Sequence, residues 1–273
     1  MECLVHDTPI YYEEYGQGTP VILIHGFTPD HRLMTGCMEP LFAQKTGWRR
    51  IYLDLPGMGR TPGKAFVNSS DDMLDLVLGF IDAIIPGQRF LLVGESYGGY
   101  LSLGIMQRKF EQVEGMALIC PAIVAEASKR DVPSHTLIAP NPQLLASLAP
   151  EDAEEFGSIS VVQDTYAWEH FRDDILPGLR VADQAFLNKI RQRYAFSFDV
   201  NTLPVPFAKP TLFFMGRQDS STGYRDTWNI LENYPRGTFA VLDRAGHNAQ
   251  IEQSQLFNAL VNEWLERVQE ATR

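Results

Sequence analysis

Ser96 lies in a glycine-rich run whose residue types could perform nucleophilic catalysis. The run reads Gly-Glu-Ser-Tyr-Gly-Gly over residues 94–99; it follows the apolar run 90–93, and a helix-like stretch begins at Tyr100. Glycines around a serine, between a strand and a helix, are typical of a nucleophile elbow, a tight turn that exposes the hydroxyl above the sheet edge. The start of the helix also supplies N–H groups beside developing negative charge. We therefore predict that Ser96 is a nucleophile; the alternative is a serine that caps the helix.

A serine nucleophile needs a general base and a group that orients the base. His247 is the candidate base, because it follows the last apolar run and lies on a predicted loop before the C-terminal helix. Asp219 is the candidate acid, since it lies four residues beyond the apolar run Thr211–Met215 and 28 residues before His247. Sites in open α/β sheets gather at the carboxyl ends of the strands, where these residues are placed. The alternatives are a loop histidine bonded to the backbone and an aspartate that caps the following helix. The weaker candidates for the acid are Asp226 and Asp243.

An acyl-transfer site also needs N–H donors aimed at the oxyanion of the tetrahedral intermediate. Tyr97, the residue after the nucleophile, is expected to supply one backbone N–H. The loop His25-Gly26-Phe27 follows the apolar run Val21–Ile24, and Phe27 is the expected second donor. His25 itself is interpreted as a structural loop residue and not as a base.

The elements that must position these residues alternate along the chain. The apolar runs are continuous, as expected for strands covered on both faces of a largely parallel sheet. The predicted strands are Val21–Ile24, Ile51–Leu53, Phe90–Val93, Gly115–Ile119, Thr211–Met215 and Thr238–Leu242. The predicted helices between and after them are Asp72–Ile85, Leu101–Phe110, Arg225–Asn233 and Glu252–Val268. Residues 3–15 are expected to form one or two antiparallel edge strands, and the alternation as a whole predicts an α/β fold.

Residues 121–209 break this rhythm, because they contain no convincing strand and read as several helices. A structureless loop of this length is implausible, so the sequence predicts a helical cap inserted into one core made of residues 1–120 and 210–273. The alternative is an independent second domain. The helices expected in the insertion are Pro142–Leu148, Pro150–Phe156, Thr165–Leu176 and Val181–Tyr194.

An aromatic cluster at helical spacing in this insertion could face a substrate or could pack the cap onto the sheet. Its members, the candidate substrate-binding residues, are Tyr166, Trp168, His170 and Phe171. Arginines of the same segment could bind a carboxylate, although surface arginines are usually only solvated. These arginines are Arg172, Arg180, Arg191 and Arg193.

The composition limits the classes of function. A net charge of −11 over 273 residues argues against a nucleic-acid surface and against affinity for anionic membranes. Cys3, Cys37 and Cys120 show neither metal-ligand spacing nor a disulfide framework, which fits a reducing compartment. Neither a signal peptide nor a membrane-spanning run is recognised, so we expect a cytoplasmic protein. We predict a small-molecule substrate and no metal or cofactor, and the oligomeric state cannot be read.

Taken together, these motifs resemble the α/β-hydrolase superfamily. Three features match that superfamily: the nucleophile elbow, the loop 25–27, and the chain order of the candidate nucleophile, acid and base, which is Ser96, Asp219, His247. Residues 54–59, Asp-Leu-Pro-Gly-Met-Gly, resemble a turn that is common in its capped members. The resemblance implies a mostly parallel eight-stranded sheet with helices on both faces, a helical cap and a catalytic triad.

For activity, the resemblance implies a serine hydrolase, similar to esterases, that cleaves a small carboxylic ester through an acyl-enzyme. Two alternatives stay open. Carbon–carbon bond hydrolases of ring-cleavage products share the fold and the triad, but they usually carry tryptophan after the catalytic histidine, where this chain has Asn248. Ligand sensors of this fold keep an intact triad and turn over slowly.

Overall fold

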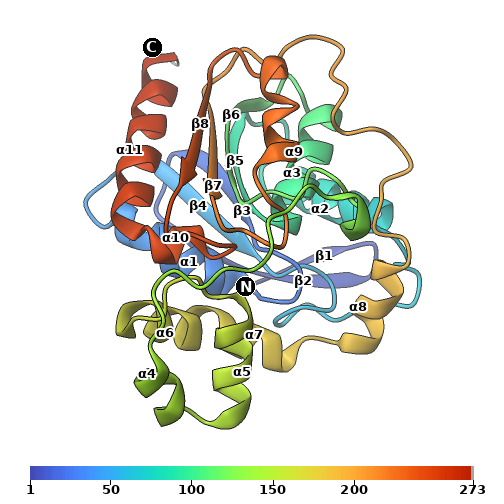
Figure 1. Cartoon of the computed structure of the whole chain (residues 1–273). Coiled ribbons are helices and arrows are strands. Elements are labelled where there is room, and N and C mark those ends of the chain that lie inside the picture. The colour runs from blue at the N-terminus through green and yellow to red at the C-terminus, as the bar shows by residue number, and fades with distance from the viewer. Residues whose placement is uncertain (272–273) are drawn as a thin grey trace.

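An eight-stranded sheet forms the centre of the computed structural model, which describes residues 1–271 (Figure 1). The strands are β1 (Glu2–Val5), β2 (Thr8–Tyr15), β3 (Thr19–Ile24), β4 (Trp48–Leu53), β5 (Phe90–Glu95), β6 (Val113–Ile119), β7 (Thr211–Gly216) and β8 (Gly237–Leu242). Their order in the sheet is β1-β2-β4-β3-β5-β6-β7-β8. β2 pairs antiparallel with both β1 and β4, and all other neighbours are parallel. The predicted architecture, including its antiparallel edge, is therefore confirmed.

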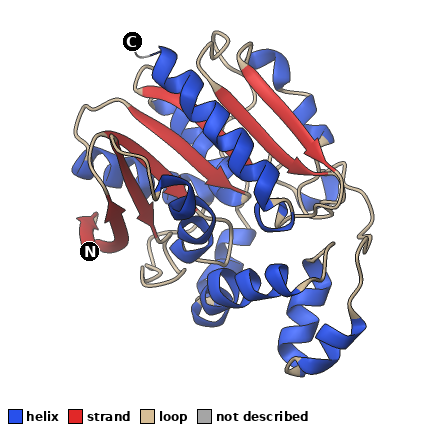
Figure 2. Ribbon diagram, turned by 90° about the vertical axis from the view of Figure 1, so that its left-hand side faces the viewer, coloured by secondary structure: helices blue, strands red, loops and turns tan. Residues whose placement is uncertain are grey.

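The central strands are largely buried on both faces, which explains their apolar runs, whereas the edge strands β1 and β8 are partly exposed. Alternate residues of β3, at positions 21–24, belong to two different clusters of buried side chains, because successive side chains of a strand point to opposite faces. Helices cover both clusters, and Figure 2 shows helices in front of the sheet and behind it. The first cluster is covered by α2 (Ser70–Ile84) and α3 (Tyr97–Arg108), and the second by α1 (His31–Phe42) and α11 (Ser254–Ala271).

The helices of the core agree with the sequence-based expectations in position, with differences in length. The predicted helices Asp72–Ile85 and Leu101–Phe110 correspond to α2 and α3. The predicted helix Arg225–Asn233 is shorter than expected, since only α9 (Arg225–Trp228) is α-helical and a 3₁₀ turn follows it. The last predicted helix, Glu252–Val268, corresponds to α11, and a separate short helix, α10 (Ala249–Glu252), precedes it. Within residues 1–271, no helix combines the length and the apolar character that crossing a membrane requires.

Helix α1 is an element that sequence analysis did not predict. Gly36 and Pro40 interrupt its helical pattern, and both residues disfavour a helix interior. Asp30 nevertheless caps the helix by accepting a hydrogen bond from the N–H of Arg32 at 3.0 Å. The buried side chains of α1 pack against the sheet, so tertiary contacts outweigh the weak local propensity.

Residues 121–209, here called the cap segment, connect β6 to β7 and carry further helices. They are α4 (Pro142–Ser147), α5 (Pro150–Ile159), α6 (Thr165–His170), α7 (Leu176–Val181) and α8 (Gln184–Arg191), with a π-helical turn at Phe171–Ile175. The predicted single helix Thr165–Leu176 is thus α6 followed by this turn. Figure 1 shows α4 to α7 gathered beyond one end of the sheet. Phe156 and Phe171 join the cluster under α1 and α11. The division of the chain at residues 121 and 209 stays a prediction.

The start of α3 approaches the neighbouring strand so closely that only glycine fits. A Cβ atom on Gly98 would lie 2.1 Å from the carbonyl oxygen of Ile24, at the end of β3. A Cβ atom on Gly94, in β5, would lie 2.4 Å from the carbonyl oxygen of Gly98. Both clashes involve backbone atoms, which cannot move aside as a flexible side chain can.

We expect Gly98→Ala to destabilise the protein by about 3 kcal/mol or more, although alanine is the better helix former. The matched control is Gly157→Ala in α5, where the nearest atom, Cδ1 of Leu145, lies 4.0 Å from the added Cβ. This control is expected to be neutral or stabilising by up to about 1 kcal/mol. Urea unfolding of both variants measures the difference, and equal midpoints would contradict the packing argument.

Candidate active site

Ser96 occupies the turn between β5 and α3 in a strained backbone conformation. Its φ is 51° and its ψ is −110°, values that a residue with a side chain rarely adopts. Both backbone groups of Ser96 are hydrogen-bonded. Its N–H donates to the Ile119 carbonyl at 2.9 Å, and its carbonyl accepts from the N–H groups of Tyr100 and Ala122. The side chain is thereby fixed at the carboxyl end of the sheet, as expected for a nucleophile elbow.

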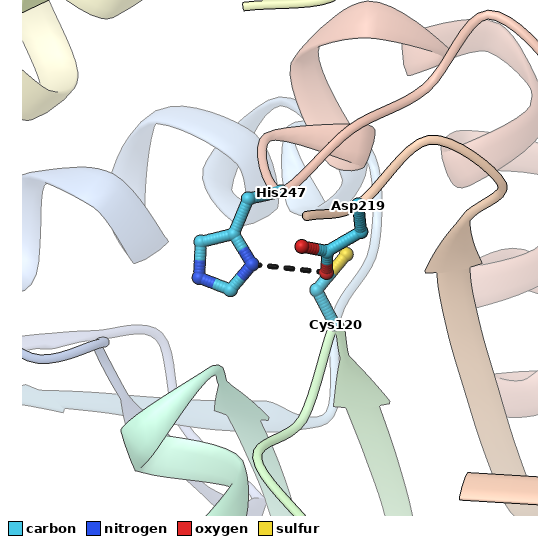
Figure 3. A group of neighbouring side chains, drawn as sticks. All are labelled: Cys120, Asp219 and His247. Atoms are coloured by element: carbon cyan, nitrogen blue, oxygen red, sulfur yellow. Dashed lines mark hydrogen bonds and ion pairs between the residues drawn. The ribbon is translucent and has the colours of Figure 1, made fainter. Parts of the chain in front are cut away.

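His247 and Asp219 lie next to Ser96 in one chain of hydrogen bonds. The Nε2 atom of His247 lies 2.9 Å from the Ser96 hydroxyl, and its Nδ1 atom lies 3.0 Å from Oδ2 of Asp219. Figure 3 shows the His247–Asp219 contact, with Cys120 beside it. Asp219 follows β7 and His247 follows β8, so neighbouring parallel strands deliver both residues to the same edge. The structure thus brings together the three residues that sequence analysis singled out.

The Asp219 carboxylate is fully buried and well supplied with donors. It accepts hydrogen bonds from the N–H of Ser221 at 2.8 Å and from the hydroxyl of Thr222 at 2.7 Å. Burial acts to raise the pKa of Asp219, but the His247 ring and these donors lower it to about 2. Asp219 is therefore ionised at neutral pH. The weaker candidates bond elsewhere: Asp226 accepts from the N–H of Asp131, and Asp243 from the side chain of Gln218.

Glu95 is a second carboxyl group beside His247, and sequence analysis missed it. It is 2% exposed, and its Oε1 atom lies 3.4 Å from Nε2 of His247. Burial raises the pKa of Glu95 to about 7, against the lowering effect of His247. A Cβ atom on Gly26 would lie 2.2 Å from Oε2 of Glu95, so the carboxyl group fills the space beside that glycine. The elbow motif allows any residue type directly before the nucleophile, so the motif could not point to Glu95.

The charge of the His247 ring depends on both carboxyl groups. Burial acts to lower the pKa of His247, whereas Asp219 and Glu95 raise it, and the balance lies above the ordinary value of 6.5. The site is therefore arranged to stabilise an imidazolium, which is the form that histidine takes after it has removed a proton from a serine.

The two residues expected to form the oxyanion hole lie beside each other near Ser96. The rings of Phe27 and Tyr97 are 5.1 Å apart. Within residues 1–271, the backbone N–H groups of Phe27 and Tyr97 form no hydrogen bond. His25 holds the loop in place, because its Nε2 atom accepts from the N–H of Leu55 at 3.0 Å, which agrees with a structural role. The oxyanion role of Phe27 and Tyr97 stays a prediction.

Two cavities meet at the nucleophile, since Phe27 and Ser96 line both of them. The larger has a volume of about 860 Å³ and its wall includes residues 125–127 and 191–195. The smaller has a volume of about 180 Å³ and is lined by His247. A substrate can therefore extend from Ser96 in two directions, into spaces of different size.

The four candidate substrate-binding residues of the cap segment lie in different places. Phe171 lines the smaller cavity at Ser96. Tyr166 and His170 instead line a separate cavity, where His170 bonds the carboxylate of Asp174 at 2.7 Å. Trp168 packs its ring against Phe171 at 6.4 Å in the buried cluster. Of these four residues, the structure brings only Phe171 to a cavity that Ser96 also lines.

Two groups of side chains in residues 1–271 are close enough together to hold a metal ion. They are Cys120 with Asp219 and His247, and Asp30 with His31 and Asp54. In the first group, burial raises the pKa of the Cys120 thiol well above its ordinary value, so the thiolate that a metal binds is disfavoured. In the second group, Nδ1 of His31 already bonds Asp54 at 2.8 Å. These contacts do not favour a metal at either place, and the expectation of a metal-free site stays a prediction.

The chain is similar to known proteins over most of its length. The model of the Alpha/beta hydrolase family matches residues 21–260. The chain is 26% identical, over 93% of its length and 98% of the relative's, to a pimeloyl-[acyl-carrier protein] methyl ester esterase of Aeromonas hydrophila. It is 25% identical, over 92% of its length and 88% of the relative's, to a 2-hydroxymuconate semialdehyde hydrolase of Pseudomonas sp. strain CF600.

A solved structure is similar over almost the whole chain. It is an alpha/beta superfamily hydrolase from Oenococcus oeni PSU-1, which is 31% identical and superimposes with a TM-score of 0.90 over 98% of this chain and 99% of the other. The family model, this structure and the arrangement of the sheet agree. The chain belongs to the alpha/beta hydrolase family.

Proposed function

We propose that the protein is a serine hydrolase that cleaves a small carboxylic ester through an acyl-enzyme. The observation that carries this proposal is the continuous hydrogen-bond chain from the Ser96 hydroxyl through His247 to the buried carboxylate of Asp219. The strained turn at Ser96 supports it, as do the backbone N–H groups of Phe27 and Tyr97, which have no hydrogen-bond partner among residues 1–271. The relatives described as methyl ester esterases support ester cleavage as the reaction.

In the proposed reaction, Oγ of Ser96 attacks the ester carbonyl carbon while Nε2 of His247 removes the hydroxyl proton. The N–H groups of Phe27 and Tyr97 donate to the resulting oxyanion. The imidazolium then gives its proton to the alcohol oxygen, and the carbon–oxygen bond to the alcohol breaks. Water, deprotonated by His247, attacks the acyl-enzyme, and the carboxylic acid leaves as Ser96 regains its proton. Asp219 keeps the ring oriented and its charge compensated throughout.

Carbon–carbon bond hydrolysis is the second candidate, because a relative at 25% identity is described as a 2-hydroxymuconate semialdehyde hydrolase. The same nucleophile and base would serve that reaction, with a carbanion in place of the alkoxide as leaving group. A slow-turnover ligand sensor is the remaining alternative. Steady turnover of simple esters without turnover of a ring-cleavage product favours the esterase, whereas a single burst without a steady rate favours the sensor.

Ser96→Ala should lower kcat by about 10⁴–10⁶-fold with unchanged thermal unfolding, because only the nucleophile is removed. A small fluorophosphonate should label the wild-type protein once, at Ser96, and should not label the variant. Ester hydrolysis and peptide mass spectrometry measure the two effects. Labelling at another serine would remove Ser96 from the proposed role.

Asp219→Asn should reduce kcat by up to about 10⁴-fold while the fold is retained, since an amide favours the wrong tautomer of His247. Asp243→Asn is the matched control, because it removes one carboxylate from the same region without a contact to His247. The control should keep activity within about twofold of the wild type. If the control is the more damaging change, Asp219 is not the orienting acid.

In a plot of kcat/KM against pH, Glu95→Gln should move the acidic limb, where activity falls as His247 becomes protonated, to lower pH. The reaction needs neutral His247, and the raised pKa of this ring places the limb above pH 6.5 in the wild type. Ionised Glu95 contributes to that shift, so its loss lowers the pKa of His247, and a limb about one unit lower is expected. Because Glu95 and His247 titrate as a pair, the wild-type limb is also expected to be broader. An unmoved limb would show that Glu95 does not act on His247.

A further inference from the structure

The larger cavity at Ser96 is cationic, although the chain as a whole carries a net charge of −11. Three arginines line it: Arg130, Arg191 and Arg193. Two carboxylates also line it, Asp71 and Glu126. Glu126 forms an ion pair with Lys129 at 2.8 Å, whereas Asp71 keeps its charge while it accepts hydrogen bonds from Ser197, so the arginines outnumber the uncompensated carboxylates. Arginines gathered in this way within an acidic protein offer a local site for an anion.

These three arginines have no carboxylate partner within the described part of the chain. Arg130 donates to three backbone carbonyls, those of Val124, Ala125 and Ser221, at 2.8 to 3.1 Å. Arg191 donates to the side-chain oxygen of Asn188 and lies over the ring of Phe27, with its guanidinium carbon 5.0 Å from the ring centre. The charge of each guanidinium is thus left uncompensated beside the cavity.

The smaller cavity has the opposite character. Leu33, Ile175 and Leu179 supply apolar side chains to its wall, and Glu95 and Glu155 also line it. A space of about 180 Å³ with this lining favours a small uncharged group and disfavours an anion.

The position of His247 tells which part of an ester enters which cavity. In the proposed reaction, Nε2 of His247 gives a proton to the leaving alcohol, so the alcohol oxygen must lie within hydrogen-bond reach of this ring. His247 lines the smaller cavity and does not line the larger one. The alcohol therefore occupies the smaller cavity, and the acyl chain extends into the larger one, which the arginines line.

From this geometry we infer the substrate class: a half-ester, in which a small uncharged alcohol is joined to an acyl chain that ends in a carboxylate. Arg191 and Arg193 bind that carboxylate. Arg130, fixed by its three carbonyl contacts, contributes positive charge to the wall. This inference rests on the proposed function, because it uses Ser96 and His247 in their proposed roles.

The first experiment compares matched substrates. Monomethyl esters of a homologous series of dicarboxylic acids are compared with methyl esters of the same length in which a methyl ketone replaces the free carboxylate. Acid release at constant pH gives kcat and KM. The best half-ester should exceed its ketone analogue at least about tenfold in kcat/KM, because guanidinium–carboxylate hydrogen bonds are lost in the ketone.

The second experiment removes the cations. Arg191→Gln and Arg193→Gln should each lower kcat/KM for the half-ester about tenfold, mainly through KM, and should change the ketone ester less than about twofold. Arg172→Gln is the matched control, because it removes an exposed arginine of the cap segment that pairs with Asp173 and lies outside both cavities. A control that lowers turnover of the half-ester equally would overturn the inference, because the effect would then come from overall charge.

The third experiment varies the alcohol. Butyl half-esters should react at least about tenfold more slowly than methyl half-esters, and Leu179→Ala, which enlarges the small cavity, should reduce that difference. Equal turnover of both alcohols by the wild type would overturn the assignment of the alcohol to this cavity.

Failure of the inference and failure of the proposed function give different results. If Ser96 is labelled by a fluorophosphonate and ketone esters are cleaved as well as half-esters, the substrate class is wrong and the hydrolase stands. The substrate class is equally wrong if Ser96 is labelled and neither ester is cleaved. If Ser96 is not labelled and no ester is cleaved, the proposed function itself fails.

Discussion

The contact between the start of α3 and the end of β3 is the constraint on which the candidate site depends. At Gly98 the two elements approach until no side-chain atom fits between them, and Gly94 makes the same approach to Gly98. This packing holds Ser96 in a backbone conformation that the residue would not adopt by itself. The burial of the central strands on both faces of the sheet offsets the unfavourable energy of that strain. The hydroxyl consequently stands where two neighbouring strand ends also deliver Asp219 and His247.

His247 has one carboxyl group beside each of its two ring nitrogens. Asp219 lies at Nδ1 and is ionised, whereas Glu95 lies at Nε2 with a pKa raised to about 7 by burial. Both groups favour the imidazolium, but only Asp219 fixes the orientation of the ring through a hydrogen bond. Glu95 and His247 both line the smaller cavity, whereas Asp219 lies behind the ring and does not line it. The three arginines line the larger cavity and not the smaller one.

Much of this arrangement could be predicted from the sequence, because parallel strands that are buried on both faces leave continuous apolar runs. Residues that follow such runs meet at one edge, and this rule, together with the glycine motif around Ser96, led to the prediction of Ser96, Asp219 and His247 as one site. The prediction failed where tertiary contacts outweigh local signals, as in α1, which tolerates Gly36 and Pro40 because it is buried against the sheet. Glu95 had no signal in the motif. Arg191 and Arg193 could be named from the sequence as candidate carboxylate ligands, but Arg130 comes from a distant segment, so its place beside them appears only after folding.

The contact between Gly26 and Glu95 has a consequence for the natural variation of this chain. The carboxyl group of Glu95 occupies the space that a side chain at position 26 would need. Substitutions at the two positions are therefore not independent: a larger residue at 26 requires the Glu95 carboxyl group to move, or a shorter residue at 95. Homologues should show the two positions changing together, and a directed-evolution library that varies either position alone will reach only part of the functional sequences.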